Sequence, residues 1–189
     1  MMRRDSIKSV LVAVMLLSGS GARAQGSPAA LPPSSFNDRV LARHNAERVR
    51  VGVPRLLWSE SLATGAQQWA KHLAAINQLT HSPSDSNNPE GENLWMGTKG
   101  AYEPEEMVQG WINEGAQFTG GVFPKVSKTG NWADVGHYTQ LIWSKTTQVG
   151  CGVASNNTDS YLVCRYAPAG NWMGENPLQP TGTAHPTRK

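Results

Sequence analysis

Two cysteines are the only thiols in this 189-residue chain, and both fall in short β-prone runs near its C-terminal end. The runs 149–154 and 161–166 flank a turn-rich Ser-Asn-Asn-Thr-Asp-Ser segment, a pattern typical of a β-hairpin. A turn centred on that segment places Cys151 opposite Cys164, close enough for a cross-strand disulfide. Two free buried thiols are the alternative. Two cysteines can form only one disulfide, too few for a small domain stabilised mainly by disulfides. A hydrophobic core must therefore stabilise this fold.

Three helices are predicted before the hairpin. The first begins after Ser35, where Ser-x-x-Asp forms a capping box, and runs to about Arg50. The second begins near Ser59, and the third has Pro104 in its first turn and ends at Gly115. The second helix has one apolar stripe at helical spacing, made of Leu62, Ala66, Trp69, Ala70, Leu73 and Ile76.

The N-terminus has the three parts of a secretory signal peptide: basic residues, an apolar run over 9–17 and a small-residue cleavage site ending at Ala24. That run is too short to span a bilayer, and no other segment has the roughly 20 apolar residues of a membrane helix. We expect secretion into the extracellular space or a periplasm. The predicted segments are a signal peptide at 1–24, flexible segments at 25–35 and 179–189, and one domain at 36–178.

Charge argues against a nucleic-acid partner. The whole chain carries 17 basic and 14 acidic residues, but four of the basic and one of the acidic residues lie in 1–24, so the mature chain is close to neutral. A neutral chain lacks the positive surface that phosphate backbones require. We therefore expect neither a nucleic-acid partner nor a transmembrane segment.

No familiar catalytic motif is present: the chain lacks H-E-x-x-H, G-x-S-x-G, a phosphate-binding loop, a dinucleotide fingerprint and paired C-x-x-C. Among the five histidines, His185 lies in the tail and His72 on the flank of the second helix, while His44 lies inside the first helix, where packing is the ordinary role. His81 in a polar loop and His137 in Gly-His-Tyr-Thr-Gln are the better site candidates.

A carboxylate adds to these candidates. Glu114 lies two helical turns after Met107, at the edge of the third helix's apolar face, and needs a partner there. His81, Glu114 and His137 are far apart in the sequence. Their spacing is compatible with a shared His/Glu site and also with separate structural roles.

Several motifs occur together in a recognisable order. They are His44-Asn45 with Arg48, Leu57-Trp58, His81-Ser82, Gly91-Glu92-Asn93-Leu94, Trp111 with Glu114, Gly136-His-Tyr-Thr-Gln-Leu-Ile-Trp143, Val149-Gly-Cys-Gly-Val153 and Tyr161-Leu-Val-Cys-Arg-Tyr-Ala-Pro-Ala-Gly-Asn171. Over 36–178 the chain thereby resembles the CAP superfamily, or SCP domain, which includes cysteine-rich secretory proteins, antigen 5 and pathogenesis-related proteins of group one.

The resemblance implies an α+β fold, a three-layer α-β-α sandwich with a central antiparallel sheet and an open groove. It pairs Cys151 with Cys164. It also implies that two histidines and two glutamates meet in the groove, where they could bind Zn²⁺ or another divalent cation, with no metal obligatory for function. A polar network that orders the groove without metal is the alternative. These four residues are His81, Glu92, Glu114 and His137.

An aromatic loop precedes the His-Tyr-Thr-Gln motif. Some relatives bind sterols through this loop, and here the corresponding stretch 117–134 contains Phe118, Phe123 and Trp132. The resemblance therefore implies a candidate lipid contact. A loop that packs its own aromatic side chains is the alternative.

Three functions follow. The leading hypothesis is a secreted, non-catalytic CAP-domain protein that holds a small or lipid ligand, or an extracellular partner, in its groove, because no nucleophile with an activating base is recognisable. The second is a metal-dependent hydrolase, a peptidase or esterase, in which the metal activates water and Glu92 or Glu114 is the general base. The third is a structural or antimicrobial extracellular protein.

Overall fold

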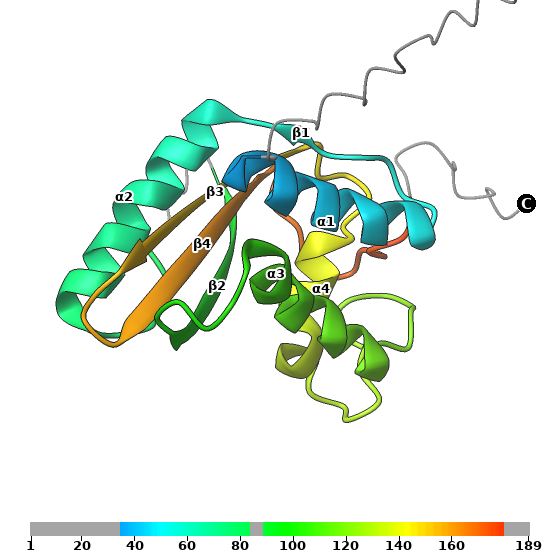
Figure 1. Cartoon of the computed structure of the whole chain (residues 1–189). Coiled ribbons are helices and arrows are strands. Elements are labelled where there is room, and N and C mark those ends of the chain that lie inside the picture. The colour runs from blue at the N-terminus through cyan, green and yellow to red at the C-terminus, as the bar shows by residue number, and fades with distance from the viewer. Residues whose placement is uncertain (1–34, 84–88, 180–189) are drawn as a thin grey trace, which may run out of the picture. The chain divides into compact units, whose positions relative to one another are not determined.

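The computed structural model of the protein describes residues 35–83 and 89–179 (Figure 1). The predicted signal peptide, most of the predicted segment 25–35 and residues 180–189 lie outside the described part of the chain. Among the helices of that part, none combines the length and the apolar character needed to cross a membrane.

A four-stranded sheet with the strand order β1-β3-β4-β2 forms the middle of the fold. The strands β2 (Gly91–Thr98), β4 (Asp159–Ala167) and β3 (Gln148–Ser155) pair antiparallel. The short strand β1 (Leu57–Trp58) runs parallel to β3 and makes the sheet mixed.

The predicted hairpin is the β3–β4 pair. Cys151 is the register partner of Cys164, and the two sulfur atoms are bonded at 2.01 Å. The disulfide is confirmed, and the alternative of two free thiols is excluded.

One helix covers the face of the sheet opposite the other helices. Helix α2 (Glu60–Ile76) begins after the N-cap Ser59, as predicted, and its apolar stripe packs on β2 and β4. Gly150 and Gly152 of β3 permit this approach, because a Cβ at either position would overlap the backbone of α2. The Gly-Cys-Gly motif thus serves packing between helix and strand.

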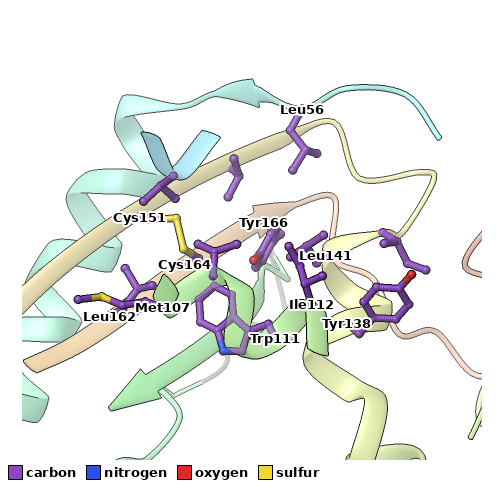
Figure 2. Close-up of a cluster of buried hydrophobic side chains, with 14 residues drawn as sticks. Leu56, Met107, Trp111, Ile112, Tyr138, Leu141, Cys151, Leu162, Cys164 and Tyr166 are labelled. Carbon is purple, nitrogen blue, oxygen red and sulfur yellow. A yellow bond between two sulfur atoms is a disulfide. The ribbon is translucent and has the colours of Figure 1, made fainter. Parts of the chain in front are cut away.

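Helices α1 (Phe36–Arg50), α3 (Pro104–Asn113) and α4 (Gly136–Leu141) cover the other face, so the three-layer sandwich is confirmed (Figure 1). The predicted capping box of α1 is present. Figure 2 shows Trp111 of α3, Leu141 of α4 and the disulfide gathered in the core between these helices and the sheet. Short 3₁₀ turns follow α3 at Glu114–Gln117 and precede α4 at Trp132–Val135.

Arg48 fixes the position of α4 although it belongs to α1. Its side chain is fully buried, and its guanidinium donates hydrogen bonds of 2.6–2.9 Å to four backbone carbonyls. These carbonyls follow α1 or lie at the C-terminal end of α4 and just beyond it. The accepting residues are Pro54, Leu141, Trp143 and Thr146.

His44 has the packing role that its place in the first helix suggested. The ring is fully buried; its Nδ1 lies 2.8 Å from the carbonyl oxygen of Val40 and its Nε2 lies 2.9 Å from the hydroxyl of Tyr166. A carbonyl only accepts, so Nδ1 carries the proton and Nε2 accepts from the tyrosine. Burial lowers the pKa of His44 to about 4, which keeps the ring neutral.

Candidate functional site

Glu114 and His137 form the first of two histidine–glutamate pairs. Glu114 Oε1 lies 2.6 Å from His137 Nδ1, and Oε2 accepts from the backbone N–H groups of His137 and Tyr138, both at 3.1 Å. These N–H groups belong to the first turn of α4, whose own N-cap residue, Val135, supplies no side-chain hydrogen bond. Glu114 therefore caps α4 from the 3₁₀ turn that follows α3 and orients His137 with the same carboxylate.

His81 and Glu92 form the second pair, at the start of β2. Glu92 accepts from His81 Nδ1 at 2.8 Å and from the backbone N–H and hydroxyl of Ser82 at 2.9 and 2.7 Å. Burial acts to raise the pKa of Glu92, but these hydrogen bonds outweigh it, so the pKa lies below its usual value. The hydrogen bond to Glu92 raises the pKa of His81 above its usual value.

The two pairs share one geometry. In each, Nδ1 of the ring faces a carboxylate that also accepts from backbone N–H groups. Nε2 is therefore the ring atom through which either histidine would bind a ligand, as in histidines that are oriented for metal binding. The glutamates act as positioning groups, with their oxygens occupied by neighbouring N–H and O–H donors.

The hydrogen bonds of the structure join the four residues as two pairs. Asn93 donates to the carbonyl of His137 at 3.0 Å, which ties α4 to β2 beside Glu92. Successive side chains of a strand point to opposite faces, however, so Glu92 and Asn93 face different layers. Within residues 35–83 and 89–179, no three His, Cys, Asp or Glu side chains lie close enough together to hold a metal ion. The donor set does not fit the four-ligand metal centre that the resemblance implied.

A cavity of about 460 Å³ opens beside the His81–Glu92 pair. His137 and Glu114 are not among its lining residues. The wall combines charged side chains of both signs with amides. Its polar side chains are those of His81, Ser82, Glu90, Glu92, Gln140, Arg165 and Asn171.

Arg165, the register partner of Glu92, is the one arginine lining the described part of this cavity. Its Nη1 donates to Glu90 at 3.3 Å, and its Nε lies 3.7 Å from Glu92. The guanidinium lies against Gly65 of α2, where a Cβ would fall 2.8 Å from Nη1. No site role is predicted from the sequence for Arg165 or Glu90, although Arg165 lies within the motif 161–171 and Glu90 adjoins Gly91.

The side-chain amides of Gln140 and Asn171 form another part of the cavity wall. Gln140, only 3% exposed, accepts from the N–H of Gly170 at 2.8 Å. Asn171, with φ of 59°, donates to the carbonyl of Gly136 at 2.9 Å and accepts from Thr139 at 2.7 Å. Both residues bind the 169–171 segment to α4 and so shape the cavity.

The aromatic loop packs much of itself. Phe123 is 1% exposed and lies in a small core with Val126, Val135 and Trp143. Phe118 is half-buried, with its ring edge-on to Tyr138 at 5.4 Å. Trp132 is 41% exposed and leans on Phe123 at 5.2 Å. Of the three predicted lipid-contact residues, the geometry leaves Trp132 accessible and favours the packing alternative for the phenylalanines.

A family model described as CAP, cysteine-rich secretory protein family, matches residues 41–166. The chain belongs to this family. It is 34% identical over 145 residues to pathogenesis-related protein PR-1 of Medicago truncatula, covering 76% of this chain and 79% of the relative. It is 40% identical over 146 residues to human cysteine-rich secretory protein 2, covering 71% of this chain but 56% of the relative. The CAP chain thus spans little more than half of the cysteine-rich secretory proteins it matches.

Solved CAP structures agree with the fold. The structure titled "Crystal structure of NaASP2 with Zn2+" has a TM-score of 0.66 and 24% identity and covers 79% of this chain and 87% of its own. Schistosoma mansoni venom allergen-like protein 4 has a TM-score of 0.56 and 20% identity over 75% of this chain and 96% of its own. Identities this low support the α+β sandwich alone.

Proposed function

We propose that this CAP protein is exported and acts as a non-catalytic binding protein, with the cavity beside His81 and Glu92 as its ligand site. The polar, roughly 460 Å³ cavity is the observation that carries the proposal. Its volume suits a small molecule or a short segment of a partner. Its wall of charged groups and amides suits a polar ligand better than a sterol.

The arrangement of Ser82 argues against hydrolysis by a serine nucleophile. In a catalytic triad the histidine stands between the hydroxyl and the carboxylate. Here the carboxylate stands in the middle: Glu92 accepts from Ser82 Oγ on one oxygen and from His81 on the other. The ring therefore does not take the proton of this hydroxyl, and Ser82 is not activated.

The metal-dependent hydrolase is the competing proposal. The solved structure of NaASP2 with Zn²⁺, which has the same fold, is the reason to test it. The pairing in this chain supports the binding role instead, because Glu92 and Glu114 are already occupied as hydrogen-bond acceptors from neighbouring N–H and O–H groups.

One experiment separates the two functions. The exported protein is analysed by native mass spectrometry for retained small molecules and metal, and its turnover of peptide and ester substrates is measured with chelator and with added Zn²⁺. The proposal predicts a retained polar ligand that Arg165→Gln releases, and turnover no higher than buffer. Turnover that rises with Zn²⁺ and disappears in both His81→Ala and His137→Ala would reject it.

A further inference from the structure

We propose that the cavity beside His81 and Glu92 binds a free α-amino acid, a small zwitterion whose ammonium and carboxylate groups lie on one carbon atom. This inference rests on the proposed function, since it names the class of polar ligand that the same cavity would hold. It follows from the polar atoms of the cavity wall that are still free to bind a ligand.

Most of the polar side chains in the wall are engaged within the protein. Both oxygens of Glu92 accept hydrogen bonds, from His81 and from Ser82. The side-chain amides of Gln140 and Asn171 each donate one hydrogen bond and accept another within the protein. These groups therefore serve mainly to shape the cavity.

Arg165, Glu90 and His81 supply the polar atoms that remain free. Nη1 of Arg165 donates to Oε2 of Glu90 at 3.3 Å. Nη2 of Arg165 and Oε1 of Glu90 have no hydrogen-bond partner among the described residues, and neither atom is fully buried. His81 directs Nδ1 to Glu92, which leaves Nε2 open on a side chain that is 65% exposed. The free atoms are thus a cationic donor, an anionic acceptor and an imidazole nitrogen.

The two free charges have opposite signs and are adjacent. Arg165 and Glu90 are 22% and 26% exposed, so a ligand that covers them displaces much of their remaining water. A ligand with a single charge would then leave one of these residues without a counter-charge, which costs affinity. An α-amino acid matches both, because its own two charges are separated by one carbon atom.

Hydrogen-bonding chemistry sets the orientation of the ligand. Its carboxylate accepts from Nη2 of Arg165, and its ammonium donates to Oε1 of Glu90. Nε2 of His81 carries no proton in the neutral ring whose proton is on Nδ1, so it is a second acceptor on the same wall. The cavity volume of about 460 Å³ leaves room for the side chain of the amino acid.

Isothermal titration calorimetry of the exported, disulfide-bonded protein, dialysed against chelator, tests the proposal. Each standard L-amino acid is titrated, and at least one is expected to bind with a Kd below about 1 mM. The N-acetyl derivative of that amino acid lacks the ammonium charge, and its methyl ester lacks the carboxylate charge. Each derivative should bind at least about tenfold more weakly, because it loses a charge-assisted contact.

Glu90→Gln and Arg165→Gln assign the two charges, and each should weaken binding of the free amino acid at least about tenfold. Glu90→Gln should also reduce the preference for the free amino acid over its N-acetyl derivative, and Arg165→Gln the preference over the methyl ester. Damage to the shape of the cavity would instead weaken binding of all three compounds alike. Glu60→Gln and Arg55→Gln, at exposed positions outside the cavity, are the matched controls and should leave binding unchanged. Melting curves should show that all variants fold.

Three results would overturn the inference: binding of no amino acid, equal binding of the free amino acid and its two derivatives, or the same loss of all three compounds in both cavity variants. Native mass spectrometry separates such a failure from failure of the proposed function. A retained polar molecule of another class, released by Arg165→Gln, would overturn the amino acid alone and keep the cavity as the ligand site. Absence of any retained or bound small molecule would overturn both.

Discussion

Glu114 and Glu92 perform the same task at two places in the molecule. Each carboxylate accepts one hydrogen bond from an imidazole, and each also accepts from the neighbouring chain: Glu114 from two backbone N–H groups, and Glu92 from the backbone N–H and hydroxyl of Ser82. Hydrogen bonds to an ionised acceptor are stronger than those between neutral groups. These glutamates are therefore expected to contribute to folding stability as well as to the site.

Glu114→Gln tests this role. The amide retains one acceptor oxygen where the carboxylate offers two, so the first turn of α4 loses a cap, and the free energy of unfolding should fall by about 1–2 kcal/mol. Urea unfolding measures the change. Glu60→Gln, in the exposed first turn of α2, is the control and should cost no more than about 0.5 kcal/mol. Equal losses in the two variants would show that Glu114 is an ordinary surface carboxylate.

The lowered pKa of His44 makes the folding stability depend on pH. Its folded pKa of about 4 lies below the usual 6.5, so the unfolded chain binds the proton more readily, and stability falls as pH falls through this interval. His81, with a raised pKa, loses its contribution above pH 6.5, and Glu92, with a lowered pKa, loses its contribution below pH 4.5. Between pH 6.5 and 4.5, the change in stability therefore reports on His44 and not on the His81–Glu92 pair.

Urea unfolding across that interval should show a loss of about 2–3 kcal/mol in the wild type, from the 1.36 kcal/mol that each pH unit contributes. His44→Gln should be less stable at neutral pH but much flatter between pH 6.5 and 4.5. A variant with the wild-type slope would assign the acid sensitivity to other groups.

At the scale of elements, the disulfide and the packing against α2 hold β3 and β4 in register. Cys151 and Cys164 are both almost completely buried, and the bond joins facing positions of the hairpin. Because the bridge closes a short loop, its main effect is to restrict the unfolded chain. The hairpin is the element that α2 and the cavity residue Arg165 depend on.

Replacing both cysteines with alanine should lower the free energy of unfolding by about 3 kcal/mol while preserving the fold. Guanidinium unfolding of the variant and of the wild type, each with and without reductant, measures this. Reductant should destabilise the wild type alone. A change below about 1 kcal/mol would mean that packing of the hairpin makes the bridge redundant.

Elements with local signals were predictable, and elements without them were not. The capping box at Ser35 and the apolar stripe of α2 encode two helices, and the turn between the cysteines encodes the hairpin. Strand β2 escaped prediction because its Gly-Glu-Asn-Leu-Trp-Met-Gly-Thr sequence has weak strand propensity, and it forms by pairing with β4. Helix α4 has six residues and depends on Glu114 and Arg48 from elsewhere in the chain.

At the scale of the whole molecule, the family resemblance predicted the sandwich and pointed to the four residues that form the two histidine–glutamate pairs. The resemblance did not predict that these residues form two pairs. Each pair is organised by a backbone N–H donor to its glutamate, from Ser82 to Glu92 and from Tyr138 to Glu114. Nor did the resemblance predict the charged cavity wall, because Arg165 and Glu90 meet only when β4 lies beside the start of β2. Such contacts depend on how distant segments pair in the folded chain, and a local sequence motif does not specify that pairing.

The pairing of both histidines with carboxylates is the central claim, and long-range ¹H–¹⁵N spectra of the imidazole rings test it most directly. Spectra recorded with chelator, well above the usual imidazole pKa, should show the proton of His81 and of His137 on Nδ1, the atom that faces glutamate. Glu92→Gln and Glu114→Gln should each change the spectrum of their own partner and leave the other ring unaltered. Rings protonated on Nε2, or a single substitution that alters both rings together, would contradict two separate pairs.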